Sequence, residues 1–340
     1  MKLLKILILG FTIIFISFSS FIVYNKDFNN YSLEKEILNH LQSIAQSKSE
    51  RVGMFLDERK NDLEYLANSP EIINLFSSDG TSLNEQINDK LIFYWKTNEY
   101  IDLVLMDIDG KILWSAKKDI TQGVDLNQEQ FKSTKYGEIF HKVKKDFGVG
   151  IFDPGYYGDE DFLSVFVTSP ILVNSKTIEN KKEMLGIIAL QIDNKQIESK
   201  VVNNFQNPSS DIVSTNIYLV NRDGTIINNM IDRSNKIVTK IDTQMYVDCF
   251  DSYNNYYQKL RGDKYTQIKQ SSIYSNYENK KVFGAHHYIL ETGLCVIVEV
   301  DKNKYYLNHS SNKKLVSILL ILSIICILSL LGFSKYCRIS

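Results

Sequence analysis

Several side chains that could hold a small molecule lie in one short segment of the sequence, residues 153–161. Four of them are candidate ligand-binding residues: Asp153, Tyr156, Tyr157 and Asp159. A tyrosine combines a large ring with a hydroxyl, and a carboxylate can pair with a cationic ligand or bind calcium. Small-molecule sites need apolar walls with a few convergent polar groups, and this segment supplies both. The alternative is an acidic surface turn with a tyrosine packed beneath it.

Three further residues are candidates for the same site. Trp95 and Trp114 are the only tryptophans, and they flank a predicted hairpin, so either could form a wall of the pocket or simply belong to the core. Gln191 stands in a predicted strand. Its amide could hydrogen-bond a ligand from the floor of a sheet, or it could point outward as a polar residue of an alternating strand.

No residue pattern in the sequence indicates catalysis. The glycines near residue 150 do not match a dinucleotide fingerprint, and the sequence has no P-loop, no H-E-x-x-H and no G-x-S-x-G motif. His286 and His287 are neighbours in a predicted strand, so their side chains point to opposite faces and cannot bind one metal ion together. We therefore predict no enzymatic activity, no metal and no cofactor. The enzymatic alternative would be a membrane-tethered hydrolase, and its structure would have to show a buried nucleophile beside a base.

The elements that position these residues begin with a long helix. From residue 31 to residue 69, apolar side chains recur at intervals of three, four or eight, which places them on one stripe of a helix. We expect the helix to end near Pro70, because proline disfavours helical geometry in the residue before it. A helix of this length reaches roughly 50 Å. A second helix is expected over residues 83–97.

An internal repeat follows the helices. Two segments, Y-I-D-L-V-L-M-D-I-D-G-K-I-L-W from Tyr100 and I-Y-L-V-N-R-D-G-T-I-I from Ile217, each read as a strand, an Asp-Gly turn and a second strand. Each hairpin precedes a polar stretch and two further strands, expected at 162–171 and 184–192 in the first copy and at 281–290 and 294–300 in the second. The sequence therefore predicts an α+β fold with two tandem antiparallel-sheet modules, residues 92–200 and 214–300.

Both ends of the chain are strongly apolar. Residues 6–23 and 315–333 are long enough to cross a hydrocarbon core, and cations lie beyond each run, at Lys2, Lys5, Lys335 and Arg338. We predict transmembrane helices at 1–24 and 314–334, a cell-membrane protein with both termini in the cytoplasm, a short tail at 335–340 and an extracytoplasmic region at 25–313. The first run could instead be a cleaved signal peptide.

The region between the two apolar runs is acidic. Without the four cations at the ends it has 39 − 4 = 35 basic and 40 acidic residues, a net charge of −5. A nucleic-acid partner is therefore not expected. The same region contains two cysteines, Cys249 and Cys295, which form either one disulfide or two free thiols.

The order of these features resembles the double Cache family, the PAS-like sensory domains of bacterial chemoreceptors, sensor kinases and cyclic-dinucleotide enzymes. The resemblance rests on "LANSPEI", "LVLMDIDGKILWS", "GIFDPGYYGDEDFLSVFVTSPI", "LGIIALQID", "IYLVNRDGTIIN" and "TGLCVIVEVD", in that order. It implies that the membrane-distal module, 92–200, binds a metabolite and that the proximal module, 214–300, relays the signal, commonly in a homodimer. The chain lacks the family's amino-acid-binding Arg-x-Trp-Tyr set, and Gln191 replaces its aspartate.

The sequence thus favours a membrane-anchored sensor, active in signal transduction and chemotaxis, that binds a small polar metabolite. Seven residues follow the second apolar run, so we expect either that the output comes from a separate signalling protein or that the chain is a truncated form of a longer receptor. The alternative is a surface-tethered adhesion or scaffold protein whose Cache-like modules bind a protein partner. A large exposed apolar patch would favour that alternative.

Overall fold

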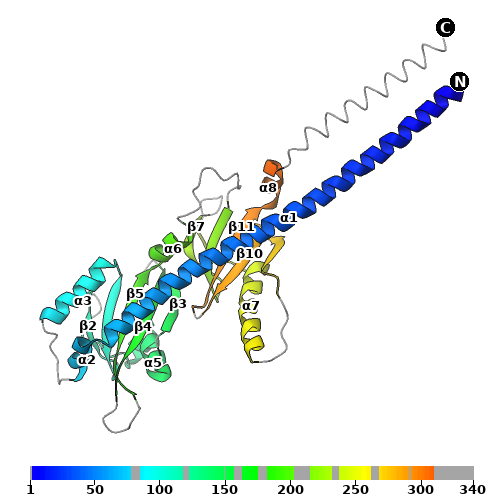
Figure 1. Ribbon diagram of the computed structural model, residues 1–340. Helices are drawn as coiled ribbons and strands as arrows, with labels where there is room; N and C mark the ends of the chain where they lie inside the picture. Colours follow the sequence, from blue (N-terminus) through cyan, green and yellow to red (C-terminus); the bar gives the residue numbers. More distant parts are fainter. Residues whose placement is uncertain are drawn as a thin grey trace.

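The computed structural model shows a long helix that packs along two antiparallel sheets (Figure 1). It describes residues 2–77, 85–117, 122–148, 150–156, 163–174, 182–202, 215–231, 237–261, 268–290 and 292–309, with side chains in the first helix described from residue 31 onward.

Helix α1 runs without interruption over Lys2–Ala67. The separate helices expected at 1–24 and 31–69 are thus one helix, because neither proline nor glycine occurs between Tyr24 and Tyr31 to break it. The predicted apolar stripe is confirmed, since its members from Ile37 to Leu66 are buried apart from the partly exposed Phe55. Helix α2, Pro70–Ser77, begins at Pro70, a residue that suits the first position of a helix.

Over the residues whose side chains the structure describes, no helix is long and apolar enough to span a membrane. The predicted span at 314–334 and the tail at 335–340 lie outside the described residues, and so do the side chains of residues 1–24.

The first sheet has the strand order β2-β1-β5-β4-β3, with every neighbouring pair antiparallel. Its strands are β1 Asp102–Asp107, β2 Ile112–Ser115, β3 Gly150–Tyr156, β4 Leu163–Asn174 and β5 Lys182–Asp193. One face packs against α1, α2 and helix α3, Glu85–Thr97, and the other packs against helix α5, Lys135–Asp146, which follows the short helix α4, Glu129–Lys132.

The second sheet has the order β8-β7-β6-β11-β10-β9 and repeats the connectivity of the first. Its strands are β6 Thr215–Asn221, β7 Thr225–Ile231, β8 Ile237–Lys240, β9 Ser271–Ser275, β10 Lys281–Ile289 and β11 Leu294–Asp301. Helix α6, Asn194–Val202, links the two sheets, helix α7, Gln244–Leu260, covers one face of the second sheet, and helix α8, Lys302–His309, follows its last strand. The predicted repeat is thus confirmed at the level of the two sheets.

Both predicted Asp-Gly hairpins are present, at β1–β2 and β6–β7. Gly110 and Gly224 have φ values of 87° and 82°, a left-handed conformation that glycine adopts without steric cost. In the first hairpin, Oδ1 of Asp107 accepts hydrogen bonds from two backbone N–H groups of the turn. In the second, Oδ1 of Asn221 accepts one from Thr225. These bonds fix the register of strands that carry the residues described below.

Cys249 and Cys295 form a disulfide that joins α7 to β11, with their Cα atoms 6.5 Å apart. Both residues are fully buried in the core between α7 and the second sheet. Of the two alternatives for these cysteines, the structure has the disulfide. The bridge holds α7 against the sheet that it covers.

The two neighbouring histidines point to opposite faces of the second sheet, as predicted. His286 lies 3.1 Å from Oγ of Ser252 on α7, and His287 lies 2.7 Å from Oγ of Ser49 on α1.

Candidate ligand-binding site on the first sheet

Five polar side chains are gathered on the face of the first sheet that α5 covers. We call them the first-sheet cluster: Asp102, Ser115, Tyr136, Ser164 and Gln191. The strands carry them inward because Asp102 pairs with Gln191 across β1 and β5, and the side chains two residues along each strand face the core beneath α5. All but Tyr136, which is partly exposed, are buried. Small-molecule sites combine apolar walls with a few convergent polar groups, and this face of the sheet has both kinds of side chain.

The hydroxyl of Tyr136 is shared between two acceptors. It lies 3.3 Å from Oδ2 of Asp102 and 3.3 Å from Oε1 of Gln191. A hydroxyl has one proton, so it can donate to only one of these oxygens at a time. Both distances also exceed the usual O–H···O length of about 2.7–2.8 Å. A ligand with two or more N–H or O–H donors would satisfy both acceptors better than Tyr136 does.

Asp102 is fully buried and accepts hydrogen bonds from neutral groups. The donors include the backbone N–H groups of Leu103 and Lys117, at 2.8 and 3.0 Å, and the hydroxyl of Ser115. Burial raises the pKa of Asp102, and these hydrogen bonds offset part of that effect. The carboxyl group anchors the start of β1 and is the acidic group of the cluster.

The structure brings Gln191 close to β3, the strand that contains the first residues of the 153–161 segment. Nε2 of Gln191 donates to Oγ of Ser164 at 3.0 Å, and Ser164 pairs with Gly155 across β3 and β4. Asp153 and Tyr156 therefore lie on the strand beside the first-sheet cluster, although their side chains are outside the described residues. Tyr157 and Asp159 are outside the described residues altogether, and the binding role of all four stays a prediction.

The two tryptophans lie on the other face of the first sheet, in the core with α1. The indole N–H of Trp114 donates to Oδ1 of Asn88 at 3.1 Å, and that of Trp95 donates to the carbonyl of Ile101 at 3.3 Å. The sheet separates them from Gln191, so we leave them out of the proposed site.

Sequence reasoning missed four members of the first-sheet cluster. Asp102 did carry a signal, because it is a charged residue inside an otherwise apolar strand. Ser115, Tyr136 and Ser164 carried none, since their neighbours in space come from separate strands and from α5.

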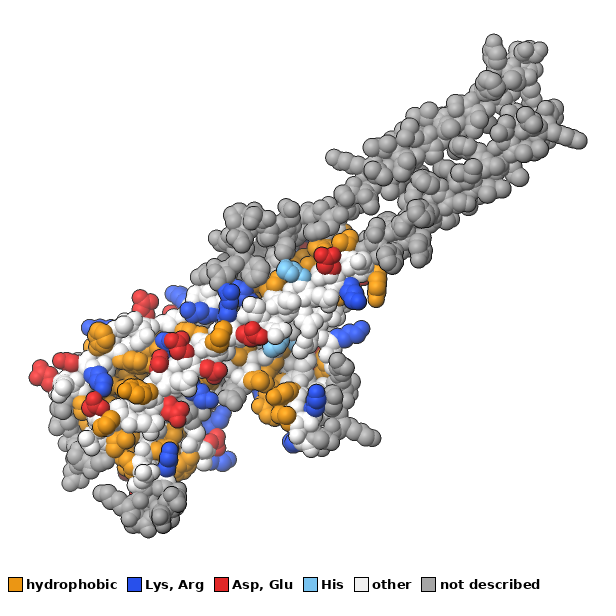
Figure 2. All heavy atoms as spheres, in the orientation of Figure 1, with side chains coloured by type: hydrophobic (Ala, Val, Ile, Leu, Met, Phe, Trp, Pro, Cys, Tyr) orange, Lys and Arg blue, Asp and Glu red, His pale blue; other side chains and the backbone are white. Residues whose placement is uncertain are grey.

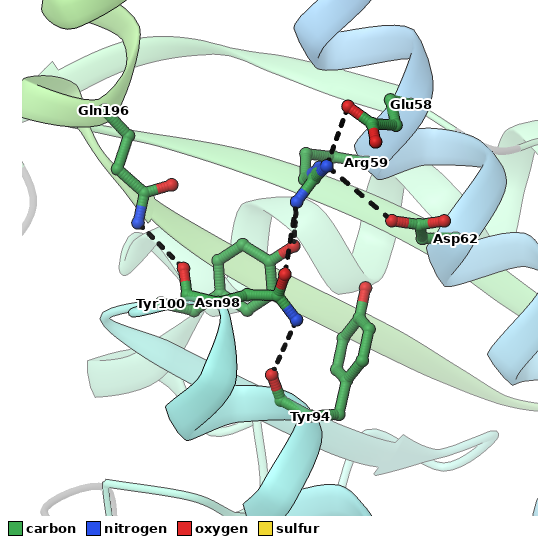
Figure 3. A network of polar contacts seen from close by, with 7 residues as sticks. All are labelled: Glu58, Arg59, Asp62, Tyr94, Asn98, Tyr100 and Gln196. Carbon is green, nitrogen blue, oxygen red and sulfur yellow. Dashed lines mark hydrogen bonds and ion pairs between the residues drawn. The ribbon is translucent and has the colours of Figure 1, made fainter.

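A second polar network connects the first sheet to α1 (Figure 3). Nη1 of Arg59 on α1 donates to the hydroxyl of Tyr100 at 2.9 Å, and Nη2 lies 2.8 Å from Glu58. Tyr100 is two residues before Asp102, and Gln196 on α6 donates to the backbone carbonyl of Asn98 at 3.0 Å. The network thus joins α1 and α6 to the segment that leads into β1.

Comparisons with known proteins identify the fold. No family model matches the sequence, and no curated protein matches it by sequence. Among solved structures, the chain is similar to the sensor domain of the Vibrio cholerae histidine kinase DctB, with 13% identity, a TM-score of 0.51 and coverage of 79% of this chain and 98% of that one. The chain has the double Cache fold.

Two further double Cache domains match equally well. The ligand-binding domain of the Pseudomonas aeruginosa amino acid chemoreceptor PctB, in complex with L-Arg, has 13% identity and a TM-score of 0.50, over 84% of this chain and 99% of that one. The sensory domain of the Campylobacter jejuni chemoreceptor Tlp3, with isoleucine bound, has 14% identity and a TM-score of 0.50, over 82% and 98%. At these identities the likeness establishes the double Cache fold, and the site has to be argued from this chain's own residues.

Proposed function

We propose that this protein is a membrane-anchored extracytoplasmic sensor whose first sheet, in the module expected to lie far from the membrane, binds a small polar molecule. The observation that carries the proposal is the Tyr136 hydroxyl shared between two buried acceptors. A ligand that donates to Asp102 and Gln191 would displace this hydroxyl and so move α5 relative to the sheet. The proposal includes the anchor at 1–24 and 314–334 and assigns the chain no catalytic step.

The fold supports this proposal because its neighbours include sensory domains solved with L-Arg and with isoleucine. The cluster favours a ligand with several N–H or O–H donors, since the two groups that share the Tyr136 hydroxyl are both acceptors. We propose that Asp153, Tyr156, Tyr157 and Asp159 contribute to the same site from the β3 side, as the pairing of Gly155 with Ser164 allows.

The test is a thermal-shift screen of the full chain in detergent against amino acids, carboxylates, amines, nucleobases, sugars and divalent ions. A ligand at 100 times its Kd stabilises the folded state by about 2.7 kcal/mol. We expect one chemical class to raise the melting temperature of the wild type. Gln191→Leu, which removes the amide and keeps the size, should weaken that ligand at least about 10-fold because a buried hydrogen bond is lost.

The matched control is Gln46→Leu, at an exposed position of α1 remote from the cluster. It should bind like the wild type. A ligand that binds Gln191→Leu as tightly as the wild type would contradict the site. A screen without any shift would contradict the sensor proposal and favour a protein partner. Figure 2 shows where such a partner could dock, since hydrophobic side chains are exposed on α7, among them Tyr256, Tyr257 and Leu260.

We also propose that the Arg59 network transmits the ligand's effect to α1, which in a parallel homodimer would pack beside its copy. Binding can shift a conformational equilibrium only by its differential affinity for the two states, so the relay needs contacts that differ between them. We propose that the Arg59 contacts are the ones that differ, because Arg59 bonds to Tyr100, two residues from Asp102.

Arg59→Met is expected to lower the free energy of unfolding by about 2 kcal/mol, because it removes a charged hydrogen bond from a mostly buried side chain. Urea unfolding of the full chain measures this change. Arg51→Met is the control, since Arg51 is exposed on the same helix. Equal effects of the two substitutions would contradict a specific role for Arg59.

A further inference from the structure

The internal repeat places Glu299 in the second sheet at the position that Gln191 occupies in the first. The two residues are 299 − 191 = 108 positions apart, on the equivalent strands β11 and β5. Gln191 pairs with Asp102 on β1, and Glu299 pairs with Asn216 on the equivalent strand β6. Both side chains face the helix that covers the sheet, α5 in one case and α7 in the other. The second sheet thus carries its own buried polar group where the first carries its candidate site.

Glu299 has only 1% of its surface exposed and is surrounded by three neutral donors. The hydroxyl of Tyr218 donates to Oε1 at 2.5 Å, and the hydroxyl of Tyr274 donates to the same oxygen. Among the residues that the structure describes, Oε2 accepts one long contact, 3.4 Å, from Nδ2 of Asn276. Hydrogen bonds to a carboxylate are usually about 2.7–2.9 Å when the donor is a charged N–H group. Oε2 therefore has capacity for a stronger donor.

Among the described residues, the titratable groups beside Glu299 do not supply a cation. His286 lies on the same face, on the adjacent strand β10, and burial lowers its pKa to about 4, so it is neutral at pH 7. The amine of Lys280 forms an ion pair with Glu278. A buried carboxylate whose contacts are neutral carries a desolvation penalty of several kcal/mol that an opposite charge would offset.

The ring of Tyr274 packs against the backbone of the strand next to Glu299. Gly284 pairs with Glu299 across β10 and β11, and a Cβ atom at Gly284 would overlap this ring. Tyr274 lies on β9, the edge strand of the second sheet, which pairs with β10 alone. Because Gly284 has no side chain, the phenol ring of Tyr274 packs directly over it on the face of the sheet that carries Glu299.

We propose that the residues Tyr218, Tyr274, Asn276 and Glu299 form a second ligand site, for a small organic ammonium ion. The N–H donors of the ammonium group bind Oε2 of Glu299 and replace the hydroxyl of Tyr274 on Oε1. Movement of the Tyr274 ring off Gly284 makes the space for the ligand's carbon atoms. The site is separate from the first-sheet cluster and does not depend on it.

The test is calorimetric titration of the full chain in detergent with methylammonium, ethanolammonium and putrescine, with sodium chloride at the same ionic strength as the reference. We expect at least one ammonium ion to bind the wild type. Glu299→Gln, which keeps the shape and removes the charge, should weaken it at least about 10-fold, as loss of a buried charge pair implies. Gln46→Leu, at an exposed position of α1, should bind it unchanged. Loss of binding in Glu299→Gln with Gln191 and Asp102 intact separates this site from the first-sheet cluster.

Two further measurements keep the proposal open to refutation. Tyr274→Phe removes the competing hydroxyl and should bind the ammonium ion as tightly as the wild type or more tightly. Without ligand, Glu299→Gln should melt no lower than the wild type, because it removes a buried charge whose contacts are neutral. The proposal would be overturned if no ammonium ion bound the wild type, or if Glu299→Gln bound it equally well. A large drop in the melting temperature of Glu299→Gln would also overturn it, because it would show that the carboxylate is a structural acceptor.

Discussion

Loss of the Cys249–Cys295 disulfide is expected to lower the free energy of unfolding by about 4 kcal/mol. The two cysteines are 46 residues apart, so the bond closes a long loop and removes much of the conformational freedom of the unfolded chain. In the folded protein the bond holds α7 on the face of the second sheet that also carries Glu299. Reduction should therefore loosen this helix before the first sheet is affected.

Urea unfolding with and without a reductant measures the effect, and Cys249→Ser provides the same comparison without a reductant. The reduced wild type and the variant should lose similar stability, and the reductant should not change the variant further. A loss below about 1 kcal/mol would contradict the prediction, because it would show that the bond constrains the unfolded chain very little.

Leu56→Ala is expected to lower the free energy of unfolding by about 3 kcal/mol, within the range of about 2–5 kcal/mol for such substitutions in a core. Leu56 is fully buried in the core that α1 shares with the two sheets. Its truncation removes apolar contacts and leaves a cavity that the rigid sheets cannot close. The substitution also weakens the attachment of the helix through which we propose the signal passes.

The matched control for Leu56→Ala is Met54→Ala, on the same helix with 64% of its surface exposed. It should change the stability by less than about 0.5 kcal/mol, as exposed positions usually do. Urea unfolding of the three proteins measures both values. Similar losses from the two substitutions would show that α1 is not docked through the stripe that contains Leu56.

The sequence alone was sufficient for the parts of the fold that depend on short-range patterns. The apolar stripe of α1 and the turns at Gly110 and Gly224 follow from residue spacing and from glycine's conformational freedom. The continuity of α1 was not predicted, because polarity between residues 24 and 31 suggested a break although no breaking residue stands there. Whether Cys249 and Cys295 form a disulfide could not be decided from the sequence, since separation in sequence says nothing of the distance between two Cα atoms.

The candidate site was only partly accessible to sequence reasoning. Gln191 could be placed on a sheet, but its neighbours Tyr136 and Ser164 depend on strand register and on how α5 packs. Trp114 shows the converse, because its place beside a hairpin left a pocket wall and a core role both open, and only the register shows that it packs in the core with α1. Glu299 was inside a recognised repeat, yet its importance emerges only from the two tyrosines that converge on it.

The most direct test of the sensor proposal is hydrogen–deuterium exchange of the full chain with and without the compound that gives the largest thermal shift. Ligand bound at Asp102 and Gln191 should slow amide exchange in β1, in β5 and at the start of α5, and Gln191→Leu should abolish that protection. Protection confined to other parts of the chain, or protection that survives Gln191→Leu, would contradict a ligand site on the first sheet.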